Sequence, residues 1–184
     1  MPTREEAWEL LNQYNKTDSL IKHALSVEGV MRHFAKKYGE DEEKWGVIGL
    51  IHDLDYEMYP EEHCKKTEEI LTAHNWPKDY IRAVLSHGYG LVNEVEPKET
   101  VEKILYTIDE LTGLITACAY MRPSKSVNDM EVKSVVKKFK SPAFASGVDR
   151  SVILNGCSLL GMELNDVVEE CILGMRAIAP SIGM

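Results

Sequence analysis

Apolar residues recur at helical spacing along most of this chain, and no segment shows the strict alternation of a half-buried strand. In the segment 18–39, for example, Leu20, Val27 and Phe34 fall on one face of a helix. Gly39 then offers a residue for the left-handed turn that ends many helices. The pattern therefore predicts an all-α fold.

The same periodicity predicts the individual helices. The expected ranges are about 4–14, 18–39, 42–52, 61–74, 78–87, 99–121, 129–139, 149–160 and 165–178. The pair Ser141-Pro142 predicts a further helix start, because proline suits the first helical position. No linker or repeat divides the 184 residues. We therefore expect one domain over 1–184, with a core over about 15–120 and a C-terminal helical cap over about 121–184.

The charge balance narrows the partners that the chain can have. With 21 Lys and Arg against 30 Asp and Glu, the formal net charge is −9, which disfavours duplex nucleic acid and anionic membranes as partners. A small phosphorylated substrate stays open, because a metal and a few local cations can meet its charge. The four cysteines form no C-x-x-C pair, and no apolar run is long enough to cross a bilayer. These features predict free thiols and a cytoplasmic protein, and they leave a homo-oligomer open.

His23 lies in the middle of the apolar face of the segment 18–39, so its ring is expected to point inward. A buried imidazole needs a partner for each nitrogen. His23 is therefore either a core histidine bonded to a backbone carbonyl or a metal ligand aimed at an interior site.

Two other positions carry polar side chains that are expected to be buried, and each could also be a metal ligand. The pair His52-Asp53 directly follows an apolar run at the end of a predicted helix, and Asp109 interrupts an apolar helix face. Burying such groups is unfavourable unless something pairs with them. A divalent cation does so, since it accepts imidazole nitrogen and carboxylate oxygen together. A local ion pair or a helix-end cap is the alternative. Glu110 lies one position round the helix from Asp109 and is expected to be solvated.

Taken in order, His23, His52-Asp53 and Asp109 resemble the metal signature of the HD superfamily of phosphohydrolases, with 29 residues from His23 to His52 and 56 from Asp53 to Asp109. The strings SLIKHALSVEGVMRHFA, WGVIGLIHDLDYE and ILYTIDELTGLITA resemble the helices that carry these ligands in that superfamily. The likeness extends over about residues 15–120, and the C-terminal region resembles that of small bacterial members.

This resemblance implies a compact helical bundle with a C-terminal extension, in which His23, His52, Asp53 and Asp109 hold a divalent ion. It also implies metal-dependent hydrolysis of phosphate monoesters or diesters, often in nucleotides, with Asp53 as the catalytic carboxylate. Two other functions fit the same fold. They are a non-catalytic module that binds a nucleotide or signals, and a di-iron oxidative enzyme.

Some members of the superfamily hold a second metal through two further histidines, which His63 and His87 resemble. We expect His63 to lie within the predicted helix 61–74. The alternative for both is a surface histidine near a helix end, and His33 and His74 are expected to be structural or surface residues. The resemblance thus implies one or two divalent ions, whose identity among Fe, Mn, Mg, Zn, Co and Ni the sequence leaves open.

The residues after His52-Asp53 depart from the usual two-metal pattern, which continues with Ile-Gly and a basic residue. Here the string is Leu-Asp-Tyr-Glu, which brings in the acids Asp55 and Glu57. These acids either position a water molecule at the site or are solvated loop residues, and we expect the latter.

A negatively charged phosphate substrate also needs positively charged side chains to bind it. Arg122, Lys125 and Arg150 lie in predicted loops or at helix ends, where phosphate contacts are often made. They are the expected phosphate-binding residues.

Overall fold

The computed structural model describes residues 1–184 and contains helices but no β-sheet. The longer helices are α1 (Arg4–Tyr14), α2 (Asp18–Tyr38), α3 (Glu42–Leu50), α6 (Thr100–Tyr120), α8 (Arg150–Leu160) and α9 (Leu164–Ala177). The shorter ones are α4 (Lys65–Ala73), α5 (Lys78–Leu85), α7 (Val132–Phe139) and α10 (Ala179–Ile182), with 3-10 turns at Pro60–Glu62 and Ser86–Gly88. The predicted all-α fold is confirmed.

Most predicted helices end close to their expected limits, and α2 stops at Gly39 in the left-handed conformation (φ 71°). Two differences affect the candidate site. The helix predicted over 42–52 ends at Leu50, so that the His52-Asp53 pair lies in the turn that follows. The helix predicted over 61–74 begins only at Lys65, because Cys64 has a φ of 68°, which no α-helix can accommodate.

Two further differences concern the C-terminal third. The Ser141-Pro142 pair begins a series of turns instead of the predicted helix, since Ala145 has a φ of 46° and interrupts any helical path there. The short helix α10 was not predicted, because four residues carry too little periodic signal to identify it.

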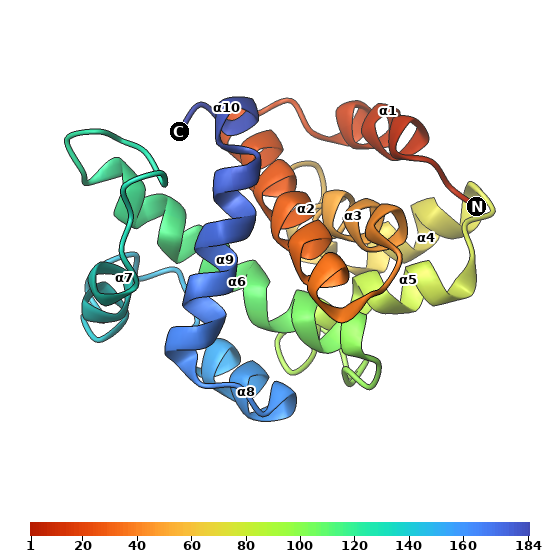
Figure 1. The fold of residues 1–184 in the computed structure, drawn as a ribbon. Helices are drawn as coiled ribbons and strands as arrows, with labels where there is room; N and C mark the ends of the chain where they lie inside the picture. Colours follow the sequence, from red (N-terminus) through yellow and green to blue (C-terminus); the bar gives the residue numbers. More distant parts are fainter.

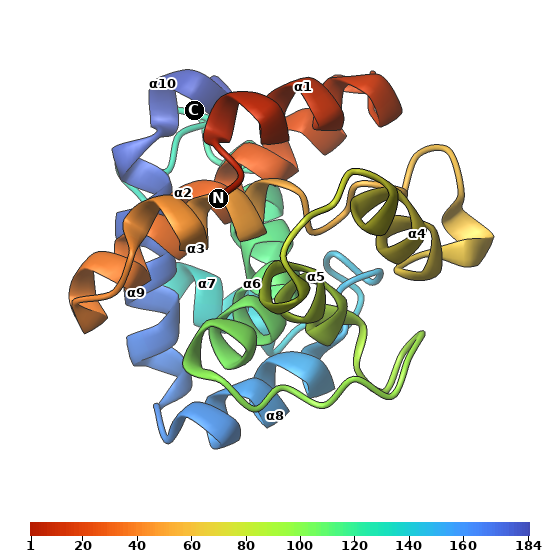
Figure 2. The ribbon, with the colours of Figure 1, turned by 90° about the vertical axis from the view of Figure 1, so that its right-hand side faces the viewer.

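Helix α2 lies at the centre of the fold, with α3 packed on one side and α9 along another, while α6 crosses behind them (Figure 1). Helix α8 packs on α6, and α4 and α5 lie on the right-hand side of the bundle in Figure 1, the side that faces the viewer in Figure 2. One continuous hydrophobic core extends from Ala7 to Ile182, so α9 and α10 share it with α2 and α6. None of the helices combines the length and the apolar character that crossing a bilayer would require.

The contact between α8 and α6 depends on Gly156. A Cβ atom at this position would lie 2.1 Å from Thr107 Oγ1 and 2.9 Å from Thr107 Cα, so the helices approach this closely only because Gly156 has no side chain. We expect Gly156→Ala to lower the free energy of unfolding by about 1–3 kcal/mol, measured by urea denaturation. Gly113→Ala on α6 is the control, because its Cβ would meet only Val148 Cγ2, at 4.0 Å. An equal loss in both variants would contradict the steric explanation.

Candidate metal centre

Three parts of the fold bring four of the predicted ligands together: His23 on α2, His52 and Asp53 in the turn after α3, and Asp109 on α6. His23 Nε2 lies 2.9 Å from Asp109 Oδ1 and 3.2 Å from His52 Nε2. Asp53 Oδ2 lies 3.3 Å from His52 Nε2 and 3.7 Å from His23 Nε2. One ligand atom from each of the four residues lies within 4.8 Å of the others, so this group could hold a metal ion.

A second group lies beside the first and consists of His63, Cys64 and His87. His63 Nε2 is 3.0 Å from His87 Nε2. Asp53 joins the two groups, because its Oδ1 lies 3.4 Å from His63 Nε2 and 3.3 Å from His87 Nε2, whereas its Oδ2 faces the first group. The two oxygens of one carboxylate thus face two separate pairs of histidines.

Three of the cluster histidines direct their Nδ1 atoms away from the cluster, each toward an oxygen acceptor. The acceptors are Gly49 O for His52 (2.8 Å), Val84 O for His87, and Asp55 Oδ1 for His63 (2.7 Å). Gly49 and Val84 lie in the last turns of α3 and α5, where carbonyl groups have no partner within the helix. A histidine that donates from Nδ1 keeps an electron pair on Nε2, and these Nε2 atoms face the cluster. The arrangement suits the binding of a cation.

The electrostatics of the cluster also favour the binding of a cation. Burial alone would lower the pKa of His52, but the charges of Asp53 and Asp109 outweigh it and raise the pKa to about 10. Burial would also lower the pKa of His63. The hydrogen bond to Asp55 acts in the opposite direction, and the pKa of His63 rises to about 9. Burial would raise the pKa of Asp53 and Asp109, but the charge of His52 holds both below their usual range. The carboxylates therefore favour positive charge between them, carried by protons or by a metal ion.

Asp55 contacts the candidate site, so the expectation that it is a solvated loop acid is wrong, and the alternative that placed it beside the site is the closer one. Its side chain is fully buried, and its Oδ2 accepts a hydrogen bond from the backbone N–H of Thr67 (2.8 Å), while Oδ1 accepts from His63. Asp55 therefore fixes the orientation of the His63 ring. Glu57 is not part of the site, because its carboxylate accepts hydrogen bonds from the backbone N–H groups of Lys16 and Thr17, at the start of α2.

The cluster opens into a pocket of about 410 Å³, a volume typical of small-molecule sites. Apolar residues contribute much of its wall, among them Leu20, Leu91, Val92 and Val148. Glu110 also lines this pocket, where it is half-buried and its carboxylate accepts from the backbone N–H of Asp149 (3.0 Å), so it is less solvated than expected. Burial and the neighbouring charge of Asp109 raise the pKa of Glu110 to about 7. None of the 14 lining residues is Lys or Arg.

The three basic residues predicted to bind phosphate lie outside this pocket. Arg122 pairs with Asp129 (3.0 Å), and Lys125 is exposed. Arg150 donates to backbone carbonyls, including those of Ala145 (2.8 Å) and Val148 (3.1 Å), so its guanidinium already has partners within the chain. The phosphate-binding role stays a prediction, and this geometry gives it no support.

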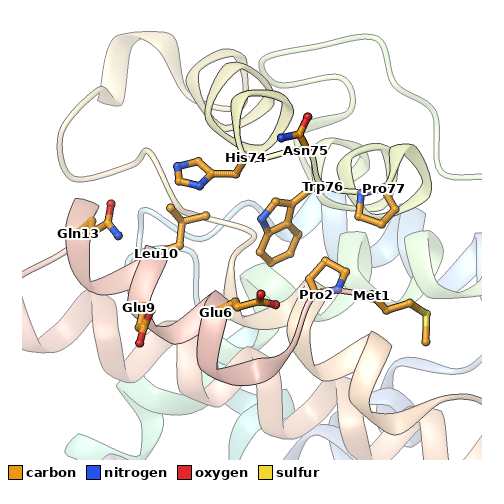
Figure 3. A pocket seen from close by; sticks show the side chains of 10 residues that line it. All are labelled: Met1, Pro2, Glu6, Glu9, Leu10, Gln13, His74, Asn75, Trp76 and Pro77. Carbon is orange, nitrogen blue, oxygen red and sulfur yellow. The ribbon is translucent and has the colours of Figure 1, made fainter.

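The remaining histidines lie apart from the cluster, in positions that fit the structural or surface roles expected for them. His33 Nε2 lies 2.6 Å from Glu170 Oε2 and links α2 to α9. His74 is exposed and lines a different hollow, of about 440 Å³, in which it and Trp76 face Leu10 and Gln13 of α1 (Figure 3). None of the residues lining that hollow belongs to either metal-ligand group.

Comparison with protein families supports the resemblance. A family model described as HD domain matches residues 20–114, just over half of the chain, and this segment contains every predicted metal ligand from His23 to Asp109. No curated protein and no solved structure gives a significant match.

Proposed function

The chain belongs to the HD domain family, and we propose that it is a metal-dependent hydrolase of phosphate esters that acts on a small, nucleotide-like substrate. The observation that carries this proposal is the position of Asp53, whose two carboxylate oxygens face two separate pairs of histidines. A carboxylate between two divalent cations is a common arrangement for phosphate hydrolysis.

The donor set suits divalent cations of the first transition row. The first ion would lie among His23, His52, Asp109 and Asp53 Oδ2, and the second would lie against Asp53 Oδ1, His63 and His87. When bound, such ions supply the positive charge that polarises a phosphoryl group and makes a water molecule nucleophilic near neutral pH. A set rich in imidazole favours Fe, Zn, Co or Ni over Mg.

Besides the histidines of the cluster, the pocket presents acids to a phosphate and no Lys or Arg side chain. Asp53, Asp109 and Glu110 line it, and each ionised carboxylate among them repels an anionic substrate. Phosphate binding would therefore depend on the metal ions. Leu91 and Val92 provide an apolar wall that would contact the part of the substrate beyond the phosphate. A nucleobase, which is flat and weakly polar, fits such a wall better than a bare sugar does.

Removal of metal should abolish activity. We expect chelator-treated protein to release no phosphate from p-nitrophenyl phosphate or from nucleoside monophosphates, and Mn²⁺, Co²⁺ or Fe²⁺ to restore turnover. The reason is that the pocket contains no Lys or Arg side chain that could replace the charge of the ions. A nucleoside 5′-monophosphate should also show a lower KM than ribose 5-phosphate, because only the nucleotide carries a base to meet the apolar wall. Bis(p-nitrophenyl) phosphate separates diesterase from monoesterase activity.

Other outcomes of this experiment favour the two alternative functions. Protein that binds metal and nucleotide but hydrolyses no ester would contradict the proposed hydrolase and favour a binding or signalling module. Oxygen consumption by iron-loaded protein, without phosphate release, would favour the oxidative enzyme.

A further inference from the structure

We propose that Cys64 is a ligand of the second metal ion, so that this half of the cluster is a mixed imidazole and thiolate site. This role rests on the proposed function, because it requires an ion between His63 and His87. The sequence suggested only the two histidines for this ion.

The geometry around Cys64 suits such a role. Its Sγ lies 4.0 Å from His87 Nε2, which in turn lies 3.0 Å from His63 Nε2. Bonds of about 2.0 Å to nitrogen and about 2.3 Å to sulfur, arranged as a tetrahedron, separate the ligand atoms by roughly 3.3–3.7 Å. The two observed distances lie on either side of this range. Asp53 Oδ1, which is 3.3 Å from His87 Nε2, would supply a fourth donor atom.

The backbone at Cys64 also has an unusual conformation. Its φ of 68° and ψ of −43° lie in a region that residues with a Cβ atom rarely adopt and that is unfavourable for them. Cys64 also occupies the N-cap position of α4, yet its side chain makes no capping hydrogen bond there. Glycine would suit the backbone, and serine or aspartate would suit the cap. A buried cysteine satisfies neither requirement, whereas the binding of a metal ion gives its thiol a role.

A thiolate ligand would make the two ions chemically different. Sulfur favours Zn²⁺, Co²⁺, Fe²⁺ and Cd²⁺ over Mg²⁺ and Mn²⁺, which prefer oxygen ligands. The first group contains two imidazoles and two carboxylates but no sulfur. When the ion binds at Cys64, the S–H bond breaks, its proton passes to solvent, and the electron pair left on sulfur forms the bond to the metal.

Titration of metal-free, full-length protein with Co²⁺ tests this assignment. Thiolate bound to Co²⁺ absorbs intensely in the near ultraviolet by charge transfer, whereas imidazole and carboxylate ligands do not. We expect this band in the parent and in Cys118→Ala, since Cys118 lies on α6 outside both metal-ligand groups. We expect it to be lost in Cys64→Gly. Glycine tolerates the positive φ, so this variant should keep the helical circular dichroism and cooperative unfolding of the parent.

Metal selectivity gives a second readout that does not depend on activity. Cys64→Gly should bind Cd²⁺ about 10- to 100-fold more weakly at the second site, while Mn²⁺ binding should change much less. Two bound Co²⁺ ions without the band, or a band that persists in Cys64→Gly, would overturn the role of Cys64 and leave the hydrolase proposal intact. Failure to bind Co²⁺ at all, together with no metal-stimulated hydrolysis, would overturn both.

Discussion

Replacing Asp53 with asparagine should reduce metal-stimulated phosphate release by about a thousandfold, because a metal ion contributes several kcal/mol of charge stabilisation to the transition state. Asp53 is the carboxylate that faces both groups, with Oδ2 3.3 Å from His52 Nε2 and Oδ1 3.4 Å from His63 Nε2. An amide has nearly the same shape but no charge, and its NH₂ group offers hydrogens where an ion needs an electron pair. Whichever way the amide turns, one of the two proposed ions would lose a ligand.

The control for this variant is Asp79→Asn, which removes an exposed carboxylate that pairs only with Lys44 at the surface. Phosphate release, bound metal by elemental analysis and far-ultraviolet circular dichroism should be measured on both variants and the parent. We expect Asp79→Asn to match the parent in all three. Asp53→Asn should keep the helical signal but bind at least one ion fewer. Normal turnover by Asp53→Asn with a full complement of metal would contradict the central role given to Asp53.

The residues that sequence reasoning found are those that interrupt a regular apolar pattern. His23 falls on the apolar face of α2, and Asp109 falls on an apolar face of α6, so helical periodicity alone indicates that both point inward. Helical periodicity shows which side chains of one helix face the core, even when the fold is unknown. That they meet the His52-Asp53 pair follows from how the helices pack, which only the family resemblance could suggest.

Sequence reasoning was wrong about the local structure or the burial of residues where the chain leaves helical periodicity. His63 was expected within a helix, but the positive φ at Cys64 separates it from α4 and places the histidine and the thiol beside His87. Asp55 lies in the preceding turn, where no periodic signal distinguishes a buried acid from a solvated one. The role of Arg150 stays a prediction, since a basic residue at a helix start resembles a phosphate ligand in the sequence, whereas its bonds to backbone carbonyls are visible only in the structure.

Asp55 gives the second prediction with a large effect: Asp55→Asn should weaken metal binding at the second site by about 10- to 100-fold. The Asp55 carboxylate accepts from His63 Nδ1 (2.7 Å) through one oxygen and from the backbone N–H of Thr67 (2.8 Å) through the other. An amide has a single acceptor oxygen, so one of these donors must face its NH₂ group. The loss of either bond inside the protein should also lower the free energy of unfolding by about 1–3 kcal/mol.

The metal effect of Asp55→Asn can be separated from its effect on stability. If the amide oxygen accepts from Thr67, the His63 ring loses its anchor and can take the tautomer with hydrogen on Nε2, which cannot bind a metal ion. The first site, at His23 and Asp109, has no contact with Asp55 and should keep its affinity. Glu57→Gln is the matched control, because that carboxylate stabilises the start of α2 and contacts no ligand. It should lower stability without changing Co²⁺ binding at either site. Equal Co²⁺ affinity at both sites in Asp55→Asn and the parent would mean that His63 needs no carboxylate to orient it.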